Sequence, residues 1–185
     1  MAQHASNKII ARIYGYGRGG VFTPKEFLDL APASVVKNAL ARFAAAGTIR
    51  RLLRGVYDYP AFSKLLKAPA SPDPDAIARA IARAHGWTIL PAGATALNLL
   101  GLATQVPARW EYFSDGPAKK YTWAGGTLSF TRRAIKETST LSPRTALLVQ
   151  ALKTLGADRV DDKVLATLRT QFTAQERTRA RREAQ

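Results

Sequence analysis

The chain has 185 residues, and its 46% apolar content is typical of a folded protein, which excludes a disordered or fibrous one. Its formal charge of +15 far exceeds what solubility requires and indicates a polyanionic partner, namely DNA, RNA or an anionic membrane surface. The absence of cysteine excludes disulfides and cysteine nucleophiles, and the two histidines are too isolated to suggest a metal site. No apolar run approaches 18 residues and the N-terminus lacks the apolar core of a signal peptide, so we expect a cytoplasmic protein without a membrane span.

Residues 6–14 predict a first short helix, because isoleucines recur there at helical spacing behind a capping Ser6 or Asn7. The run GYGRGG at 15–20 then matches the spacing G-x-G-x-x-G of a dinucleotide-binding loop. A helix rather than a strand precedes this run and no βαβ unit follows it, so we expect a flexible loop that brushes a phosphate, not a cofactor site.

Two further helices follow with the spacing of a helix-turn-helix. Thr23 can cap a short helix that runs to about Leu30, with Pro24 at its first position and Glu26 completing a capping box. The break at Ala31-Pro32 precedes a helix at 34–46, for which Ser34 is a candidate cap. One face of that second helix is apolar, and the opposite face carries Ser34, Lys37, Asn38 and Arg42.

A basic hairpin comes directly after this helix. Gly47 is a helix stop, and strands at 49–53 and 56–59 are joined by a turn at Gly55. Residues 1–60 carry nine Lys or Arg against three acids, and we interpret them as a winged helix-turn-helix that contacts DNA. The alternative, a solvated charged face on an ordinary helix, stays open.

Within this interface two roles are expected. Lys37, Asn38 and Arg42 are candidates for base edges, because Asn pairs with adenine and Arg or Lys with guanine. Phosphate contacts are expected from Ser34, Thr48, Arg50, Arg51 and Arg54, with Tyr57 and Tyr59 on the returning strand bracing against the backbone.

The Pro- and Ser-rich residues 61–74 predict a linker, and residues 75–185 a second domain, which makes the fold class α+β. We expect helices at 75–85, 92–100, 143–155 and 162–172, a strand at 87–90, a small antiparallel sheet from strands at 109–114, 119–123 and 127–131, and a frayed basic helix or tail at 176–185. Arg132, Arg133 and Lys136 are either a second anionic contact or a solvated edge that discourages strand addition.

No pattern of catalytic residues is found. The carboxylates are scattered, Asp158, Asp161 and Asp162 are explained as helix caps, and no G-x-S-x-G turn occurs. We therefore expect no enzyme, no cofactor and no metal.

Four segments, YGRGGVFTPKEFLDL, GTIRRLLRGVYDYP, SPDPDAIARAIAR and LPAGATALNLLGLATQVPARWEYFSDGP, resemble the AbiEi-type antitoxins of type IV toxin-antitoxin systems, in the same order and over nearly the whole chain. The resemblance implies a winged helix-turn-helix that binds inverted repeats in its own operon's promoter and represses it. It also implies a C-terminal domain that counteracts a nucleotidyltransferase-type toxin without a stable complex. On this resemblance Lys37, Asn38 and Arg42 belong to the reading helix, and Arg50, Arg51 and Arg54 to the wing.

Several alternatives remain open at this point. Inverted repeats fit either a dimer or a pair of monomers on the DNA. The charge also fits an RNA-binding protein, although no aromatic-rich motif for stacking RNA bases is present. A third hypothesis is a regulator without a toxin partner, whose second domain holds a small effector.

Overall fold

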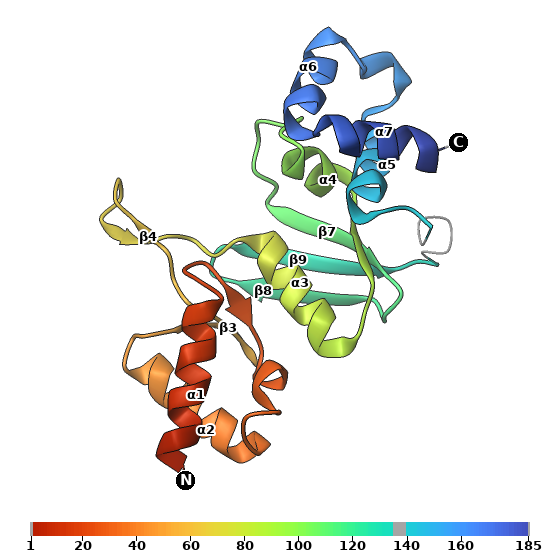
Figure 1. The fold of residues 1–185 in the computed structure, drawn as a ribbon. Coiled ribbons are helices and arrows are strands. Elements are labelled where there is room, and N and C mark those ends of the chain that lie inside the picture. Colours follow the sequence, from red (N-terminus) through yellow and green to blue (C-terminus); the bar gives the residue numbers. More distant parts are fainter. Residues whose placement is uncertain (1, 135–139, 185) are drawn as a thin grey trace. The chain divides into compact units, whose positions relative to one another are not determined.

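The computed structural model describes residues 2–134 and 140–184. It divides into two compact units, Met1–Gly86 with Thr122–Gly125 and Trp87–Tyr121 with Gly126–Gln185. Helices and strands occur in both units, so the predicted α+β class is confirmed (Figure 1). Among the described helices, none combines the length and apolar character that crossing a membrane requires.

The first unit begins with helices and a small sheet in alternation. In chain order these are α1 (Ala2–Gly15), β1 (Val21–Phe22), the 3-10 helix η1 (Pro24–Phe27), α2 (Ala33–Ala45), β2 (Arg50–Leu53) and β3 (Val56–Asp58). The strands form a sheet in the order β1-β3-β2, and both pairings are antiparallel. The central strand of this sheet, β3, is buried along its whole length.

The core of this unit is built from the apolar faces that the sequence predicts. Ile9 and Ile13 of α1 pack with Val36 and Leu40 of α2, and none of these four side chains is exposed. Phe22 joins the sheet to this cluster, because its ring stacks on Tyr57 at 6.4 Å and meets Phe27 edge-on at 5.5 Å. The helices and the sheet therefore share one core.

Two local predictions in this unit need correction. The helix expected to reach Leu30 is a single 3-10 turn at Pro24–Phe27, although the predicted capping box forms, with Thr23 N–H donating to Glu26 Oε1 at 3.0 Å. Ser34 does not cap α2, because Pro32 occupies the cap position with φ −55° and the helix already begins at Ala33. The hydroxyl of Ser34 is instead exposed in the first turn of α2.

The first unit continues beyond the predicted linker at 61–74. These residues form a hairpin of β4 (Phe62–Ser63) and β5 (Ala68–Pro69), and α3 (Pro74–His85) follows. Lys25 Nζ donates to the carbonyl of Ala84 at 2.6 Å, and Arg83 Nη2 to that of Val21 at 3.0 Å. The first compact unit thus includes α3, whereas the sequence placed this helix at the start of the second domain.

A four-stranded sheet is built mainly from residues of the second unit. It comprises β6 (Ile89–Pro91), β7 (Arg109–Ser114), β8 (Lys119–Trp123) and β9 (Gly126–Arg132) in the order β6-β7-β9-β8. The prediction of a wholly antiparallel sheet is wrong, since β7 and β9 pair in parallel. The physical reason is burial: Leu128 and Phe130 place β9 in the middle, while the exposed Lys119 and Lys120 suit β8 to the edge.

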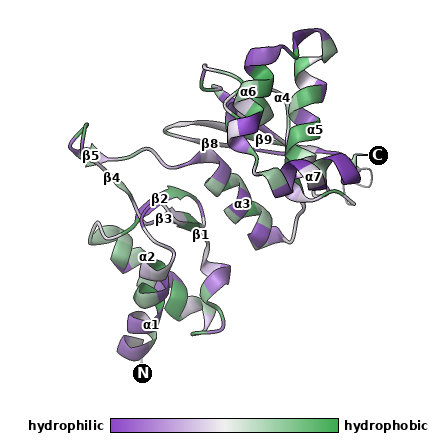
Figure 2. Cartoon of the chain, turned by 45° about the horizontal axis from the view of Figure 1, so that its top comes forward, coloured by the Kyte–Doolittle hydropathy of each residue, from purple (hydrophilic) through white to green (hydrophobic). Residues whose placement is uncertain are grey.

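Helices complete the second unit, namely α4 (Gly93–Leu99), α5 (Pro143–Leu155), the short η3 (Ala157–Arg159), α6 (Asp162–Gln171) and α7 (Ala174–Glu183). Leu100, Leu147, Ala151 and Phe172 are the buried centre of this helical layer, together with Ala96. Of the two expected forms of the basic C-terminal segment, the helix is observed as α7, which has a capping box between Thr173 and Glu176. In Figure 2, α7 is largely hydrophilic whereas α4 and α5 are largely hydrophobic.

Candidate nucleic-acid interface

The outward face of α2 carries polar side chains that have room to meet a ligand. Lys37 and Asn38 are both exposed in the second turn of the helix, and Ser34 is exposed one turn earlier. The adjacent Val36, Ala39 and Leu40 are buried, so the orientation of the helix is determined by its core face. An amide and an ammonium held side by side on a rigid helix are the groups that read base edges in a major groove.

Arg42 lies one turn further along α2 but is engaged within the protein. Its Nη2 donates to the hydroxyl of Ser6 at 2.6 Å, and Ser6 is only 4% exposed. The bond joins α2 to α1. Arg42 is therefore less free to approach a base than Lys37 or Asn38.

The arginines of the β2–β3 hairpin have different surroundings from one another. Arg50 pairs with the buried Asp58 through two bonds, Nε to Oδ1 at 3.1 Å and Nη2 to Oδ2 at 2.6 Å. Arg51 and Arg54 are exposed, and Arg51 makes a long hydrogen bond from Nε to the carbonyl of Leu53 at 3.4 Å. Arg51 and Arg54 are thus the available cations of this hairpin, with the half-buried Thr48 at its base.

The two tyrosines of the returning strand also differ. Tyr57 is 8% exposed and belongs to the core, so the structure contradicts its predicted role in bracing a phosphate backbone. Tyr59 instead contacts Tyr14, with ring centroids 5.3 Å apart, and the Arg18 guanidinium lies 4.8 Å from its ring. Tyr59 lies just beyond the end of β3, which stops at Asp58, and it is only half-buried.

The glycine-rich run at 15–20 is held in place by the chain around Tyr59. Gly19 N–H donates to the Tyr59 carbonyl at 2.6 Å, and Tyr59 N–H to the Gly20 carbonyl at 2.9 Å. Arg18 Nη1 donates to the carbonyl of Pro60 at 3.1 Å. A helix precedes this run and a strand follows it, which is the reverse of a dinucleotide-binding loop. The result is a basic, aromatic cluster of Arg18, Tyr14 and Tyr59 that sequence reasoning missed.

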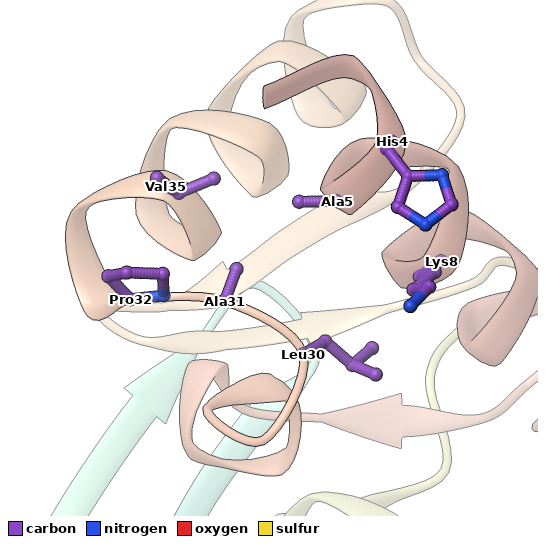
Figure 3. Close-up of a pocket in the computed structure, with 7 residues that line it drawn as sticks. All are labelled: His4, Ala5, Lys8, Leu30, Ala31, Pro32 and Val35. Carbon is purple, nitrogen blue, oxygen red and sulfur yellow. The ribbon is translucent and has the colours of Figure 1, made fainter. Parts of the chain in front are cut away.

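A shallow cavity lies between the N-terminal half of α1 and the start of α2 (Figure 3). Its volume is about 650 Å³, and it is lined by His4, Ala5, Lys8, Leu30, Ala31, Pro32 and Val35. The lining is mainly apolar, and its two basic side chains come from α1. No sequence motif signals this cavity, because α1 and the segment 30–35 meet only in the fold.

The remaining candidate residues lie in the second unit. Arg133 stacks over the ring of Phe113 at 4.6 Å, Arg132 is exposed, and Lys136 lies outside the described residues. Asp161 caps α6 by accepting from Val164 N–H at 2.8 Å, as predicted. Across 2–134 and 140–184, no group of three His, Asp or Glu side chains is arranged to hold a metal ion.

A known protein family matches residues 8–179 of the chain. The chain belongs to DUF6088, a family of unknown function. None of the curated proteins matches it. Among solved structures, the RV2827C protein from Mycobacterium tuberculosis is similar, with 24% identity and a TM-score of 0.45 over 75% of this chain and 50% of that one. The chain thus spans about half the length of that protein.

In this member of DUF6088, the predicted contact residues fall into two groups by their surroundings. Lys37, Asn38, Arg51 and Arg54 are exposed, with Ser34 beside them on α2. Arg42 is also exposed, but it and Arg50 each donate to a partner within the protein. Sequence alone could not separate these groups, because both consist of the same residue types at neighbouring positions.

Proposed function

We propose that the protein is a DNA-binding antitoxin that represses its own toxin-antitoxin operon and counteracts a nucleotidyltransferase-type toxin. It acts by binding rather than by catalysis, and as a bacterial operon repressor it works in the cytoplasm. The DNA-binding unit is a winged helix-turn-helix, in which η1 and α2 are the two helices and the β2–β3 hairpin is the wing.

One observation carries the DNA-binding part of this proposal. Lys37 and Asn38 are exposed on α2, and the hairpin that directly follows α2 exposes Arg51 and Arg54. Donors for base edges and cations for phosphates thus come from consecutive elements of one rigid unit. The order of helices and strands in this unit, with a three-stranded sheet in the order β1-β3-β2, supports the same assignment.

The toxin-directed part rests on the resemblance to AbiEi-type antitoxins. The second unit is a separate compact part of the chain with a helical layer of its own, and we assign the antitoxic function to it. Because the resemblance implies no stable complex, the antitoxic effect is expected in cells rather than as a pull-down.

Fluorescence anisotropy with the DNA upstream of the protein's own gene tests the repressor. We expect tighter binding to this DNA than to a shuffled duplex of equal length. With about six phosphate contacts, log Kd should change with log salt at a slope of magnitude near 5. Equal affinity for both duplexes would contradict the repressor function. Stronger competition by structured RNA than by duplex DNA would favour an RNA-binding protein instead.

Growth rescue tests the antitoxin. A nucleotidyltransferase-type toxin of the class that the resemblance implies is expressed from an inducible promoter, with this protein supplied from a second, unrelated promoter. Rescue by the wild-type chain and by Asn38→Ala alike is expected, since a promoter-independent supply makes repression irrelevant. Failure of the wild-type chain to restore growth would leave a repressor without antitoxic activity.

A further inference from the structure

The hairpin β4–β5 exposes apolar side chains that a folded protein normally buries. Leu65 is 91% exposed and Leu66 72% exposed, and Phe62 at the base of the hairpin is 57% exposed. Exposure of such side chains to water is unfavourable unless a partner covers them. Figure 1 shows the hairpin extending away from the helices of its own unit.

This hairpin is a defined structure rather than a loose loop. Its strands pair with Phe62 opposite Pro69 and Ser63 opposite Ala68, and Ala70 N–H donates to the Ala61 carbonyl at 2.7 Å. At the tip, Leu66 N–H donates to the hydroxyl of Ser63 at 3.2 Å, and Lys67 adopts a positive φ of 49°. The two leucines are therefore held at the apex of a turn.

The charge around the apex selects the kind of partner. Lys64 and Lys67 flank the leucine pair, and no acid occurs between Asp58 and Asp73. The partner must then combine an apolar interior with an anionic border. Stacked base pairs bordered by phosphates have this combination, and leucine is one of the side chains that proteins insert between base steps from the minor groove.

The base of the hairpin is attached to the wing. Arg50 Nη2, which pairs with Asp58 of β3, also donates to the carbonyl of Ala70 at 3.0 Å. The apolar apex and the exposed Arg51 and Arg54 are thus carried by the same small framework. The bond from Arg50 to Ala70 thus places the base of the hairpin beside the wing that carries these two cations.

We propose that the β4–β5 hairpin is an arm that inserts Leu65 and Leu66 into a base step of bound duplex DNA and bends it, with Lys64 and Lys67 on the adjacent phosphates. This inference rests on the proposed DNA-binding function but does not depend on recognition of a particular promoter. Pyrimidine–purine steps such as TA are the preferred insertion sites, because they unstack most easily.

The test uses the full chain and a 30-base-pair duplex with donor and acceptor dyes at its ends and 2-aminopurine at a central TA step. The wild-type protein should raise energy transfer, which reports bending, and raise 2-aminopurine fluorescence, which reports unstacking. The variant Leu65→Ala/Leu66→Ala should lose both signals and bind roughly tenfold more weakly, with an unchanged salt slope. The variant Lys64→Ala/Lys67→Ala should lower the magnitude of the salt slope by about 2, since each phosphate contact contributes about 0.9.

Val106→Ala is the matched control, because Val106 is another strongly exposed apolar residue, at 76%, and lies outside the hairpin. It should leave bending, unstacking and affinity unchanged. If the leucine variant bends and unstacks the duplex as strongly as the wild type does, the proposed insertion of Leu65 and Leu66 is wrong. The same conclusion would follow from leucine-dependent binding to anionic vesicles with no effect on DNA, or from a dimer that forms without DNA and dissociates when the leucines are removed. Bending without preference for the promoter would instead contradict only the repressor.

Discussion

Arg50 and Asp58 stand opposite each other in the β2–β3 ladder and form an ion pair with two hydrogen bonds. The side chain of Asp58 is 1% exposed, whereas that of Arg50 is 33% exposed. Because Arg50 also donates to Ala70, the pair both neutralises a buried carboxylate and fastens the segment that follows the wing. Arg50 therefore stabilises the β2–β3 hairpin, and its guanidinium is engaged within the protein.

Replacement of Arg50 by Ala should destabilise the protein by about 3 kcal/mol, since it leaves Asp58 buried without its cation. Arg51→Ala is the matched control, because Arg51 is the next residue and is exposed. It should change the free energy of unfolding by no more than about 0.5 kcal/mol. Urea unfolding followed by circular dichroism measures both. Similar midpoints for the two variants would show that the ion pair contributes little.

Variants of the exposed residues of α2 and of the β2–β3 hairpin should differ in how their loss of DNA affinity depends on the DNA sequence. Asn38→Ala should weaken binding to the protein's own promoter by about 1–3 kcal/mol and leave binding to random duplex nearly unchanged, because a base-edge contact is lost. Arg51→Ala and Arg54→Ala should each weaken binding to both duplexes alike and lower the salt slope by about 1. Anisotropy titrations on the two duplexes decide this, and equal losses on both by Asn38→Ala would contradict its role as a base reader.

The glycine-rich run should respond to substitution as a packing element. A Cβ at Gly20 would lie 2.8 Å from Cβ of Tyr16 and 3.0 Å from the Gly17 carbonyl oxygen, so Gly20→Ala should cost about 1–3 kcal/mol of stability. Gly15 has an ordinary backbone conformation and open space around its Cα, so Gly15→Ala serves as the control and should be tolerated. Urea midpoints that fall equally for both variants would argue against close packing at Gly20.

The second unit should lose stability in acid through Glu183. Hydrogen bonds from Thr145, Arg179 and Ser142 lower the pKa of Glu183 to about 2 from its ordinary 4.5. Its carboxylate joins α7 to the start of α5, since Oε2 accepts from the Ser142 hydroxyl at 2.8 Å and from its N–H at 2.9 Å. A lowered pKa in the folded state means that this stabilisation is complete above about pH 4.5 and is lost as the pH falls to about 2.

Glu183→Gln should therefore lower Tm at pH 7 and flatten the fall of Tm between pH 4.5 and 2. Asp158→Asn, at an exposed carboxylate in the same unit, is the control and should leave the profile as it is. Thermal unfolding monitored by circular dichroism across this pH range is the measurement. An unchanged profile for Glu183→Gln would mean that other carboxylates account for the acid sensitivity.

Local sequence patterns determined most of the secondary structure of this protein. The apolar periodicity of 34–46, the stop at Gly47 and the turn at Gly55 sufficed for α2 and the basic hairpin, because helices and hairpins depend mainly on neighbouring residues. The formal charge of +15 likewise follows from the composition alone, and it indicates a polyanionic partner whatever the fold.

Only the tertiary structure decided which of these residues are available to a partner. The register of β2 and β3, with an irregularity between Arg51 and Leu53, sets Arg50 against Asp58 and leaves Arg51 in solvent. The insertion of β9 between β7 and β8, and the attachment of α3 to the first unit, likewise depend on distant partners. Such choices follow from the burial and pairing free energy of the whole unit, which no local pattern contains.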